Sequence, residues 1–387
     1  RELFPGGIAI DRARLDWESA LAATREAMRW RVPLYEPAFD REGAACRVDI
    51  LVPVPAVDSG GGEGWDLYEV KSGSSPKPEN VEDVAFQTFV LRGAGVALRR
   101  SHLVHLDSAY VREGELDVAR LFTVVDLTAT IDPLLPGVAR RVADLQSVQA
   151  QADEPQVAIG QHCETPYGCP LVPSCWSGIP EESVFTLTRG GRKSWELFAR
   201  AIVDLVGTPD DFDLSLKQQI QVAAARRGGP HIDSAALRSF LASLTYPISY
   251  LDFETSALAV PPFSGTRPYQ AIPFQYALYV VDPPHAEPRV SAFLAEGDGD
   301  PRRAFLTALR RDLGEMTGKG SIVAFNADFE RGRLAELAAA YPEHTEWAER
   351  ARGRFVDLLV PFRDFAYYHP SQLGSASLKR VLPVLGA

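Results

Sequence analysis

The feature that most constrains the fold is a strict alternation of apolar and acidic residues near position 250. Leu251 and Phe253 alternate with Asp252 and Glu254. Successive side chains of a β-strand point to opposite faces, so the two carboxylates share one face and the two apolar side chains share the other. The segment is therefore predicted to be a strand that presents a pair of carboxylates.

Composition bounds the class of protein. The chain has 387 residues, 46% of them hydrophobic and 10% aromatic, which is enough for two or three domains with real cores. No apolar run approaches the ~20 residues that cross a bilayer, so no membrane association is expected. The net charge of −11 argues against a sequence-specific DNA-binding factor but not against an enzyme whose carboxylates hold metal ions.

The cysteine count and the two chain ends indicate the cellular compartment and whether the chain is a fragment. Four cysteines in a chain of this length do not resemble a secreted disulfide framework, and the start has no secretory signal pattern. A cytoplasmic, bacterial-type protein is expected. The chain begins without Met and residues 377–383 read as a helix that stops soon after it begins. We therefore expect a fragment of a longer protein, truncated at both ends.

Periodicity predicts two α/β regions separated by a helical connector at 180–245. The elements expected before the connector are a helix over 11–30, strands at 48–54 and 65–71 joined by a Gly-rich turn at 59–62, a helix over 79–93, strands at 97–106 and 121–125, and a polar helical segment at 133–157. Those expected after it are strands at 248–253, 274–281, 290–294 and 321–325, with helices over 302–313 and 329–341.

A first group of polar residues falls on the early strands. Asp49 is expected in one strand, and Glu69 and Lys71 are expected on one side of its hairpin partner, with Gln87 on the next helix. A carboxylate pair binds Mg²⁺, and a lysine beside it lowers the pKa of an attacking water or stabilises charge on phosphorus. The alternative is an ordinary ion pair on an exposed strand. Asp66, three residues before Glu69, is expected to face the opposite side.

A cysteine-rich stretch follows at 160–176. Cys163, Cys169 and Cys175 are separated by turn residues, a pattern typical of a metal or cluster ligand loop. The alternative is three buried, reduced cysteines. His162 would complete a zinc site, and Cys46, the remaining thiol, is a poor but possible fourth ligand. Iron–sulfur and zinc both stay open.

The second group of polar residues surrounds the alternating strand. Asp252 and Glu254 form a pair that can hold two divalent ions about 4 Å apart. After the strand at 321–325, Asn326 is expected to turn the chain so that Glu330 lies on a first helical turn and reaches toward the pair. Asp328 is the rival ligand, or simply the helix N-cap. The alternative for the pair is a solvated strand face.

Residues 48–50, 67–72 and 83–87, followed by the cysteines, resemble the RecB-like branch of the PD-(D/E)XK nucleases. The resemblance implies that Asp49 and Glu69 bind metal, that Lys71 acts on the water and that Gln87 lies behind them. Glu36 would be an extra upstream acidic residue. Leu91 departs from the pattern, because the family often has Tyr four residues after the Gln. RecB-like relatives often carry a [4Fe–4S] cluster bound by three such cysteines and one distant N-terminal cysteine, which would lie before the present start.

Segments 250–255 and 326–330 resemble the DnaQ-like DEDD 3′–5′ exonucleases, with Glu330 where most have Asp. The resemblance implies that Asp252, Glu254 and Glu330 hold the metal ions, with Asp357 as a supporting residue. The final Asp motif, preceded by Tyr or His, would lie beyond residue 387, so the chain as given is expected to be weak or inactive as an exonuclease even if its parent is active. Residues 367–370 are interpreted as a loop that touches substrate. Over nearly its full length the chain resembles an uncharacterised bacterial family in which a domain of unknown function follows a RecB-like nuclease domain.

The resemblances imply a RecB-like α/β domain at 1–178, a helical connector at 179–246 and an RNase H-like DEDD exonuclease domain at 247–387. The predicted function is metal-dependent hydrolysis of DNA or RNA phosphodiesters with Mg²⁺ or Mn²⁺. One alternative is a nucleic-acid-binding scaffold in which one or both sites have decayed. A zinc-stabilised interaction module without catalysis is another. The sequence identifies no protein partner.

Overall fold

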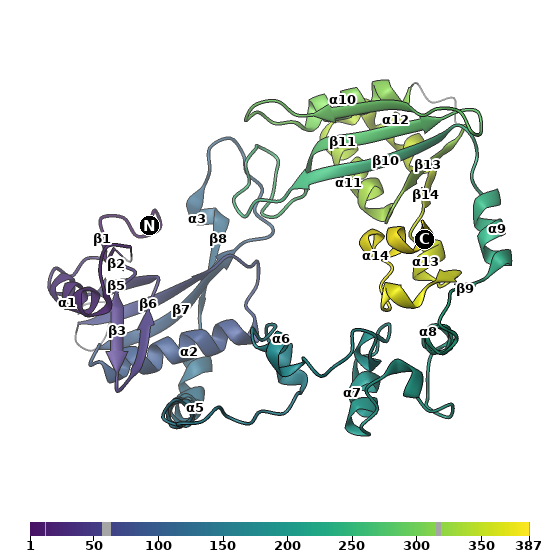
Figure 1. Cartoon of the computed structure of the whole chain (residues 1–387). Coiled ribbons are helices and arrows are strands. Elements are labelled where there is room, and N and C mark those ends of the chain that lie inside the picture. The colour runs from purple at the N-terminus through teal and green to yellow at the C-terminus, as the bar shows by residue number, and fades with distance from the viewer. Residues whose placement is uncertain (12, 56–62, 315–318, 387) are drawn as a thin grey trace. The chain divides into compact units, whose positions relative to one another are not determined.

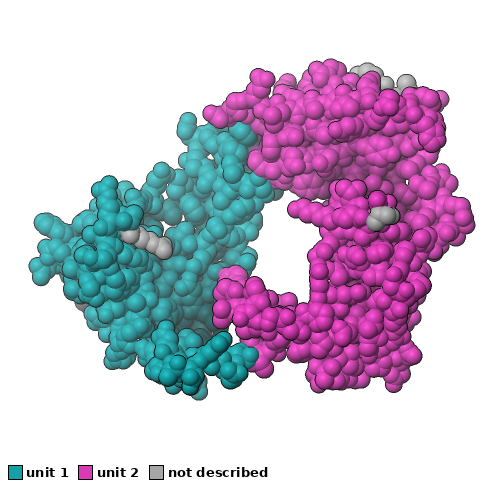
Figure 2. Space-filling view, in the orientation of Figure 1, with its two compact units in different colours: residues 1–157, 257–270 teal, residues 158–256, 271–387 magenta. Residues whose placement is uncertain are grey.

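The computed structural model describes residues 1–11, 13–55, 63–314 and 319–386. The chain forms two compact units (Figure 2): unit 1 comprises Arg1–Val157 and Ala257–Gln270, and unit 2 comprises Ala158–Ser256 and Ala271–Ala387. Both units mix helices and strands (Figure 1). No helix in the described ranges is long and apolar enough to cross a membrane. The Gly-rich turn predicted at 59–62 lies outside the described residues.

Unit 1 contains one large sheet with helices packed against it. Its elements are β1 (Ile8–Ala9), α1 (Trp17–Met28), β2 (Leu34–Tyr35), β3 (Ala38–Arg41), β4 (Ala44–Arg47), β5 (Ile50–Val54), β6 (Gly64–Lys71), α2 (Pro78–Gly93), β7 (Leu98–Leu106), α3 (Val118–Leu121), β8 (Phe122–Asp126), α4 (Thr128–Ile131) and α5 (Leu135–Gln149). The predicted order α-β-β-α-β is confirmed for α1, β5, β6, α2 and β7. The short strands β1 to β4 were not predicted.

The sheet of unit 1 has the order β1-β2-β5-β6-β7-β8. β5 and β6 are antiparallel, as predicted, whereas β6 and β7 are parallel and are joined through α2. Parallel neighbours need such a crossover, because a tight turn cannot return the chain to the same end of the sheet. Fully buried leucines of the sheet and apolar side chains of α2 form the core between them: Leu51, Leu67, Leu103, Val84 and Leu91. α2 is thereby held against the strand that carries Glu69.

Unit 2 begins with short helices and ends with a second sheet and its helices. Its elements are α6 (Val172–Cys175), α7 (Arg192–Ala199), α8 (Leu216–Arg227), β9 (His231–Ile232), α9 (Ser234–Ala242), β10 (Ile248–Ser256), β11 (Ile272–Val281), β12 (Arg289–Leu294), α10 (Arg302–Leu313), β13 (Ser321–Ala324), α11 (Asp328–Ala340), α12 (Thr345–Arg352), β14 (Phe355–Asp357), α13 (Val360–Arg363), β15 (Tyr367–Tyr368) and α14 (Leu378–Leu385). The strands and helices predicted after residue 246 are confirmed, with ends that differ by a few residues.

The sheet of unit 2 has the order β12-β11-β10-β13-β14. β12, β11 and β10 are antiparallel, whereas β10, β13 and β14 are parallel. The alternation predicted for β10 is confirmed: Leu251 and Phe253 are buried, and Asp252 and Glu254 are exposed. Phe253 packs edge-on against Phe305 of α10 with ring centroids 5.0 Å apart. The apolar face of β10 therefore anchors the strand and leaves its acidic face to solvent.

The helices of the predicted connector have a small core of their own, formed by Val184, Leu187, Leu197, Leu205 and Val222. They also join the C-terminal part of the chain. Ala224 of α8 packs with Phe365 and Tyr368, and β9 pairs with β15. The predicted boundaries at 178 and 246 stay predictions, because compactness alone does not define which parts fold independently.

The prediction that residues 367–370 form a loop is wrong for the first two of them, whereas their contact with substrate stays a prediction. Tyr367 and Tyr368 form β15, and Tyr368 is only 1% exposed and stacked on Phe365. The hydroxyl of Tyr367 donates to the carbonyl of Val384 at 3.1 Å. These aromatic side chains hold the end of the chain against β9 and α8.

Candidate functional site

Side chains from three elements of unit 1 meet at one place. Lys71, on β6, lies with its Nζ 2.6 Å from Oε1 of Glu69 and 2.5 Å from Oδ2 of Asp83, on α2. Asp49 accepts a hydrogen bond from the backbone N–H of Val70 at 2.7 Å. Asp49 lies in the bend just before β5, so its predicted place inside a strand is wrong by one residue. The structure thus brings Asp49, Glu69 and Lys71 together.

Gln87 supports this group from one helical turn further along α2. Its Nε2 donates to Oδ1 of Asp83 at 3.2 Å, and its side chain is buried. Oε1 of Gln87 is buried and has no hydrogen-bond partner in the described ranges. A buried amide oxygen without a donor is costly, so this atom is suited to a ligand or water that completes the site.

Burial sets the electrostatics of the group. Loss of solvation, together with the neighbouring charge of Asp49, raises the pKa of Glu69 to about 7. Burial also raises the pKa of Asp49, although the Val70 N–H bond opposes the change. Burial works against the charge of Lys71, but hydrogen bonds to Asp83 and Glu69 outweigh it and raise the lysine's pKa. The lysine is therefore charged, and it neutralises part of an acidic cluster.

The group opens onto a pocket of about 470 Å³ within unit 1. Asp49, Lys71 and Glu36 line it, so the upstream acidic residue considered from the sequence lies beside the other two. Asp66 lies elsewhere, as its spacing predicted, because its Oδ1 accepts a hydrogen bond from the backbone of Arg100 at 3.1 Å. Cys46 is half-buried, and desolvation and the charges of Asp83 and Glu69 raise its pKa to about 12.

The second group lies on the sheet of unit 2. Asp252 and Glu254 project from the exposed face of β10, and Glu330 lies in the first turn of α11. Glu330 is only 3% exposed, and its Oε2 has no hydrogen-bond partner within the described part of the chain. Burial, with added repulsion from Asp252 and Asp357, raises the pKa of Glu330 to about 7. The structure therefore brings Glu330 near Asp252 and leaves one of its oxygens unpartnered.

Asp357 organises the turn that delivers Glu330. Its Oδ1 accepts the backbone N–H groups of Asn326 and Leu359, both at 2.9 Å. Asn326 has φ +73°, a left-handed conformation that asparagine adopts more readily than most residues. The turn after β13 predicted at Asn326 is thus confirmed. Asp357, the predicted supporting residue, lies at the end of β14.

Asp328 is neither the N-cap of α11 nor a partner of the acidic pair. The N-cap is Ala327, and Asp328 begins the helix with a side chain 81% exposed and paired with Arg331 at 3.2 Å. The structure therefore distinguishes the two candidate ligands of α11. Glu330 turns inward, and Asp328 turns to solvent.

The cysteine loop spans a short 3₁₀ helix and α6. Cys163 is buried, Cys169 is half-buried and Cys175 is exposed, and the backbone N–H of Cys169 donates to the carbonyl of Cys163 at 2.8 Å. No three His, Cys, Asp or Glu side chains of the described ranges converge as a ready metal site. The cysteines as placed do not fit a cluster or a zinc ion without rearrangement. A Mg²⁺ site needs fewer protein ligands than a cluster or a zinc ion, because Mg²⁺ is commonly held by one or two carboxylates and completed by waters and substrate oxygens. The carboxylate pairs of the two groups are enough for such a site.

Asp83 is the site residue that sequence reasoning missed. It lies four residues before Gln87, so both side chains share one face of α2. That spacing was the available signal, since a residue on the same helical face as Gln87 reaches the same group.

Comparison with known families adds one finding. Residues 249–377 match the model of a domain of unknown function, DUF2779. The match covers α11, β14 and all but the first residue of β10, and hence the whole second group. No curated protein matches the chain.

Proposed function

We propose that this protein is a metal-dependent nuclease that hydrolyses phosphodiester bonds of DNA or RNA. The observation that carries the proposal is the buried, unpartnered oxygen of Glu330 beside Asp252 and Asp357. Burying a carboxylate next to other carboxylates is unfavourable unless a cation offsets the charge. A divalent cation bound between Glu330 and Asp252, and completed by water or substrate oxygens, would offset this charge.

The sheet of unit 2 supports an RNase H-like exonuclease domain. Its acidic strand, β10, is central, with antiparallel neighbours on one side and parallel neighbours on the other. Asp252 and Glu254 lie on its solvent face, and Glu330 approaches from α11. This arrangement agrees with the two DEDD motifs on which the resemblance rests, and 3′–5′ polarity follows from the resemblance alone.

The sheet of unit 1 supports a RecB-like nuclease domain. An antiparallel pair, β5 and β6, is followed by α2 and a parallel strand, β7. Asp49, Glu69 and Lys71 meet where this pair faces α2. These are the three residues to which the resemblance to RecB-like nucleases assigns the metal and water site.

In both sites Mg²⁺ or Mn²⁺, when bound, supplies an activated water and stabilises charge on the phosphate. Asp252, Glu254 and Glu330 would hold the ions in one site, and Asp49 and Glu69 in the other. Lys71 stays protonated and places a positive charge beside the phosphate oxygens. Gln87 and Asp83 keep the Lys71 ammonium in place.

A second candidate is a nucleic-acid-binding scaffold whose first site no longer cleaves. The ammonium group of Lys71 already bridges Glu69 and Asp83, so part of the acidic charge is neutralised without a metal ion. Under this alternative the chain binds nucleic acid through unit 1 but hydrolyses it only through unit 2, or not at all.

Hydrolysis of labelled single-stranded DNA and RNA tests the proposal. The full-length protein should release shortened products with Mn²⁺ and none with EDTA. The double variant Glu69→Ala, Asp252→Ala should lose the activity, and the single variants divide it between the sites. Binding without cleavage by the wild-type chain would support the scaffold and refute the nuclease.

A further inference from the structure

A pocket of about 660 Å³ lies within unit 2, between the helical connector and the C-terminal part of the chain. We call it the connector pocket. Its lining comes from the loop before α7, the first turn of α8, the end of α13 and the loop before α14, and includes Thr188, Arg189, Lys193, Lys217, Arg363 and Gly374. The volume falls in the range of small-ligand pockets, roughly 300–1,000 Å³.

Positive charge gathers around the connector pocket, although the chain as a whole has a net charge of −11. Four cationic residues line it, namely Arg189, Lys193, Lys217 and Arg363. Asp364 is the one acidic residue among the described residues of the lining. A cavity with this excess of cationic side chains attracts anions and raises their local concentration.

Arg189 is the source of the unbalanced charge. Each of the other three cationic residues pairs with a carboxylate: Lys193 with Asp213, Lys217 with Asp364 and Arg363 with Asp357. The guanidinium of Arg189 is exposed and has no hydrogen-bonded or charged partner in the described ranges. Arg189 also has φ +50°, a left-handed conformation that is unfavourable for a residue with a Cβ atom. Residues held in such conformations concentrate at functional sites.

Two glutamines of α8 fasten the loop that carries Arg189. Gln221 is fully buried; its Nε2 donates to the carbonyl of Thr186 at 2.7 Å, and its Oε1 accepts from the backbone N–H of Thr188 at 2.9 Å. Gln218 donates to the carbonyl of Thr188 at 3.0 Å. Both backbone groups of the residue before Arg189 are thus bound, so the unpaired cation projects from a fixed position.

The first turn of α8 also lines the connector pocket. Its N-cap, Ser215, and the next two residues, Leu216 and Lys217, belong to the lining. The start of a helix of 12 residues places partial positive charge and backbone N–H groups at that wall. A compact anion with several acceptor oxygens matches both this wall and the forked donors of Arg189.

We propose that the connector pocket binds a phosphate group, which Arg189 contacts and toward which Lys217 and the first turn of α8 contribute positive charge. The inference does not rest on the proposed nuclease function, because it uses neither acidic group. A phosphate group can belong to a strand of nucleic acid or to a free nucleotide. Arg363 favours the strand, since its Nη1 is 3.6 Å from Oδ2 of Asp357 and the pocket therefore adjoins the second group.

Binding in EDTA tests the connector pocket, because contacts that need a divalent ion at the acidic groups are then absent. The affinity of the full chain for a fluorescent oligothymidylate is measured by anisotropy over a range of salt concentrations. Arg189→Gly should weaken binding about fivefold at about 0.1 M salt. It should also lower the slope of log affinity against log salt by about 0.7, because one phosphate contact on a single strand is lost.

Titration calorimetry with thymidine 5′-monophosphate distinguishes the two sources of phosphate. If a strand is the ligand, the oligothymidylate binds in an Arg189-dependent way and the monophosphate gives no heat that depends on Arg189. If a free nucleotide is the ligand, the heat of the monophosphate is lost in Arg189→Gly. Both results support the phosphate site and identify its occupant.

Three controls separate binding from folding and from net charge. Glycine adopts φ +50° readily, so Arg189→Gly should melt no lower than the wild type. Arg189→Lys keeps the charge and should keep the salt slope of the wild type. Arg238→Gln removes the same charge from an exposed position of α9 outside the pocket, and should change neither affinity nor slope.

The outcomes are independent of cleavage. Weaker binding by Arg189→Gly, with normal melting and a normal Arg238→Gln variant, supports the phosphate site even if the chain hydrolyses nothing in Mn²⁺. Equal affinity of Arg189→Gly and the wild type for both ligands would overturn it, even in an active nuclease. An equal loss in Arg238→Gln would also overturn it, because the effect would then come from net charge alone.

Discussion

Glu330 is buried beside Asp252, and its Oε2 has no hydrogen-bond partner in the described part of the chain. One carboxylate thus approaches from a helix and the other from the solvent face of a central strand. Two carboxylates at close range are stable together only when a proton or a cation is shared between them. Burial first, with added repulsion from Asp252, raises the pKa of Glu330, and the same acidic surroundings underlie the affinity for divalent ions that we propose.

Stability should depend on pH through Glu330. Its pKa of about 7 in the folded chain exceeds the ordinary 4.5 of an unfolded glutamate. The native state therefore binds more protons between these values, and its stability falls as pH rises from about 4.5 to 7. Glu330→Gln should remove this loss of stability at higher pH. At pH 8 the variant should melt roughly 2–4 °C higher, the change expected for about 1 kcal/mol.

Thermal melts at pH 5 and pH 8 measure this dependence. Asp328→Asn is the control, because Asp328 lies on the same helical turn but is exposed. Its melting temperature should follow the wild type at both pH values. Equal melting of Glu330→Gln and wild type at pH 8 would refute the buried charge. Mn²⁺ should raise the melting temperature of the wild type at pH 8 and leave Glu330→Gln less changed.

Asp83 should act as a positioning residue for Lys71. Asp83→Asn keeps the shape of the side chain but weakens the bond to the ammonium group. Activity of the first site, measured in an Asp252→Ala background, should fall roughly 10- to 100-fold, as for other residues that orient a metal site. The pH profile should also shift, because a less firmly held lysine loses its proton at lower pH. Glu82→Gln, the exposed neighbour, should change neither quantity.

Colour and metal content test whether the cysteine loop binds an iron–sulfur cluster or zinc. If a [4Fe–4S] cluster forms, protein purified without oxygen should be brown, and Cys169→Ser should lose both colour and iron. Cys46→Ser should retain both, because Cys46 lies near Glu69 and Asp83. Stoichiometric zinc in a colourless protein would contradict the cluster and support the zinc alternative. Elemental analysis distinguishes the two.

Tyr368 should contribute to stability and not to substrate contact. Replacing a fully buried aromatic side chain with Ala typically costs about 3–5 kcal/mol. Chemical denaturation of Tyr368→Ala should show a loss of this size, and the Michaelis constant of the folded fraction should be unchanged. Tyr246→Ala, at a 42% exposed position, should be nearly neutral. A raised Michaelis constant with normal stability would show instead that Tyr368 contacts substrate.

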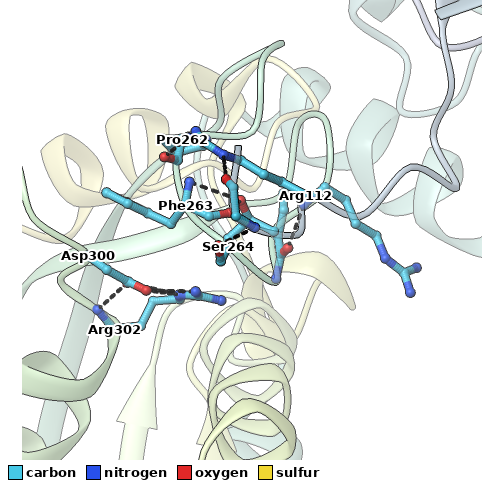
Figure 3. A network of polar contacts seen from close by, with 10 residues as sticks. Arg112, Pro262, Phe263, Ser264, Asp300 and Arg302 are labelled. Atoms are coloured by element: carbon cyan, nitrogen blue, oxygen red, sulfur yellow. Dashed lines mark hydrogen bonds and ion pairs between the residues drawn. The ribbon is translucent and has the colours of Figure 1, made fainter. Parts of the chain in front are cut away.

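Much of this architecture could be predicted from alternation and spacing. The faces of β10 and the turn at Asn326 follow from local pattern, because period-two burial and left-handed asparagine are properties of short segments. The burial of Tyr368 did not follow, since it depends on β9, more than a hundred residues earlier. The role of Asp83 depends on how α2 lies against β6, which is a tertiary relationship. Residues 257–270 belong to unit 1 through bonds with Arg112 that no local pattern reveals (Figure 3).

The proposed metal site of Asp252, Glu254 and Glu330 is tested most directly by release of labelled nucleotides from the 3′ end of a single strand in Mn²⁺. The measurement uses the full-length protein in a Glu69→Ala background, so that only the second site contributes. Glu330→Ala should lower the rate at least ~100-fold, since a lost metal ligand removes several kcal/mol of charge stabilisation. Asp328→Ala, two residues earlier and exposed, should keep the full rate. Equal rates in the two variants would contradict the assignment of Glu330 and, with it, the proposed site.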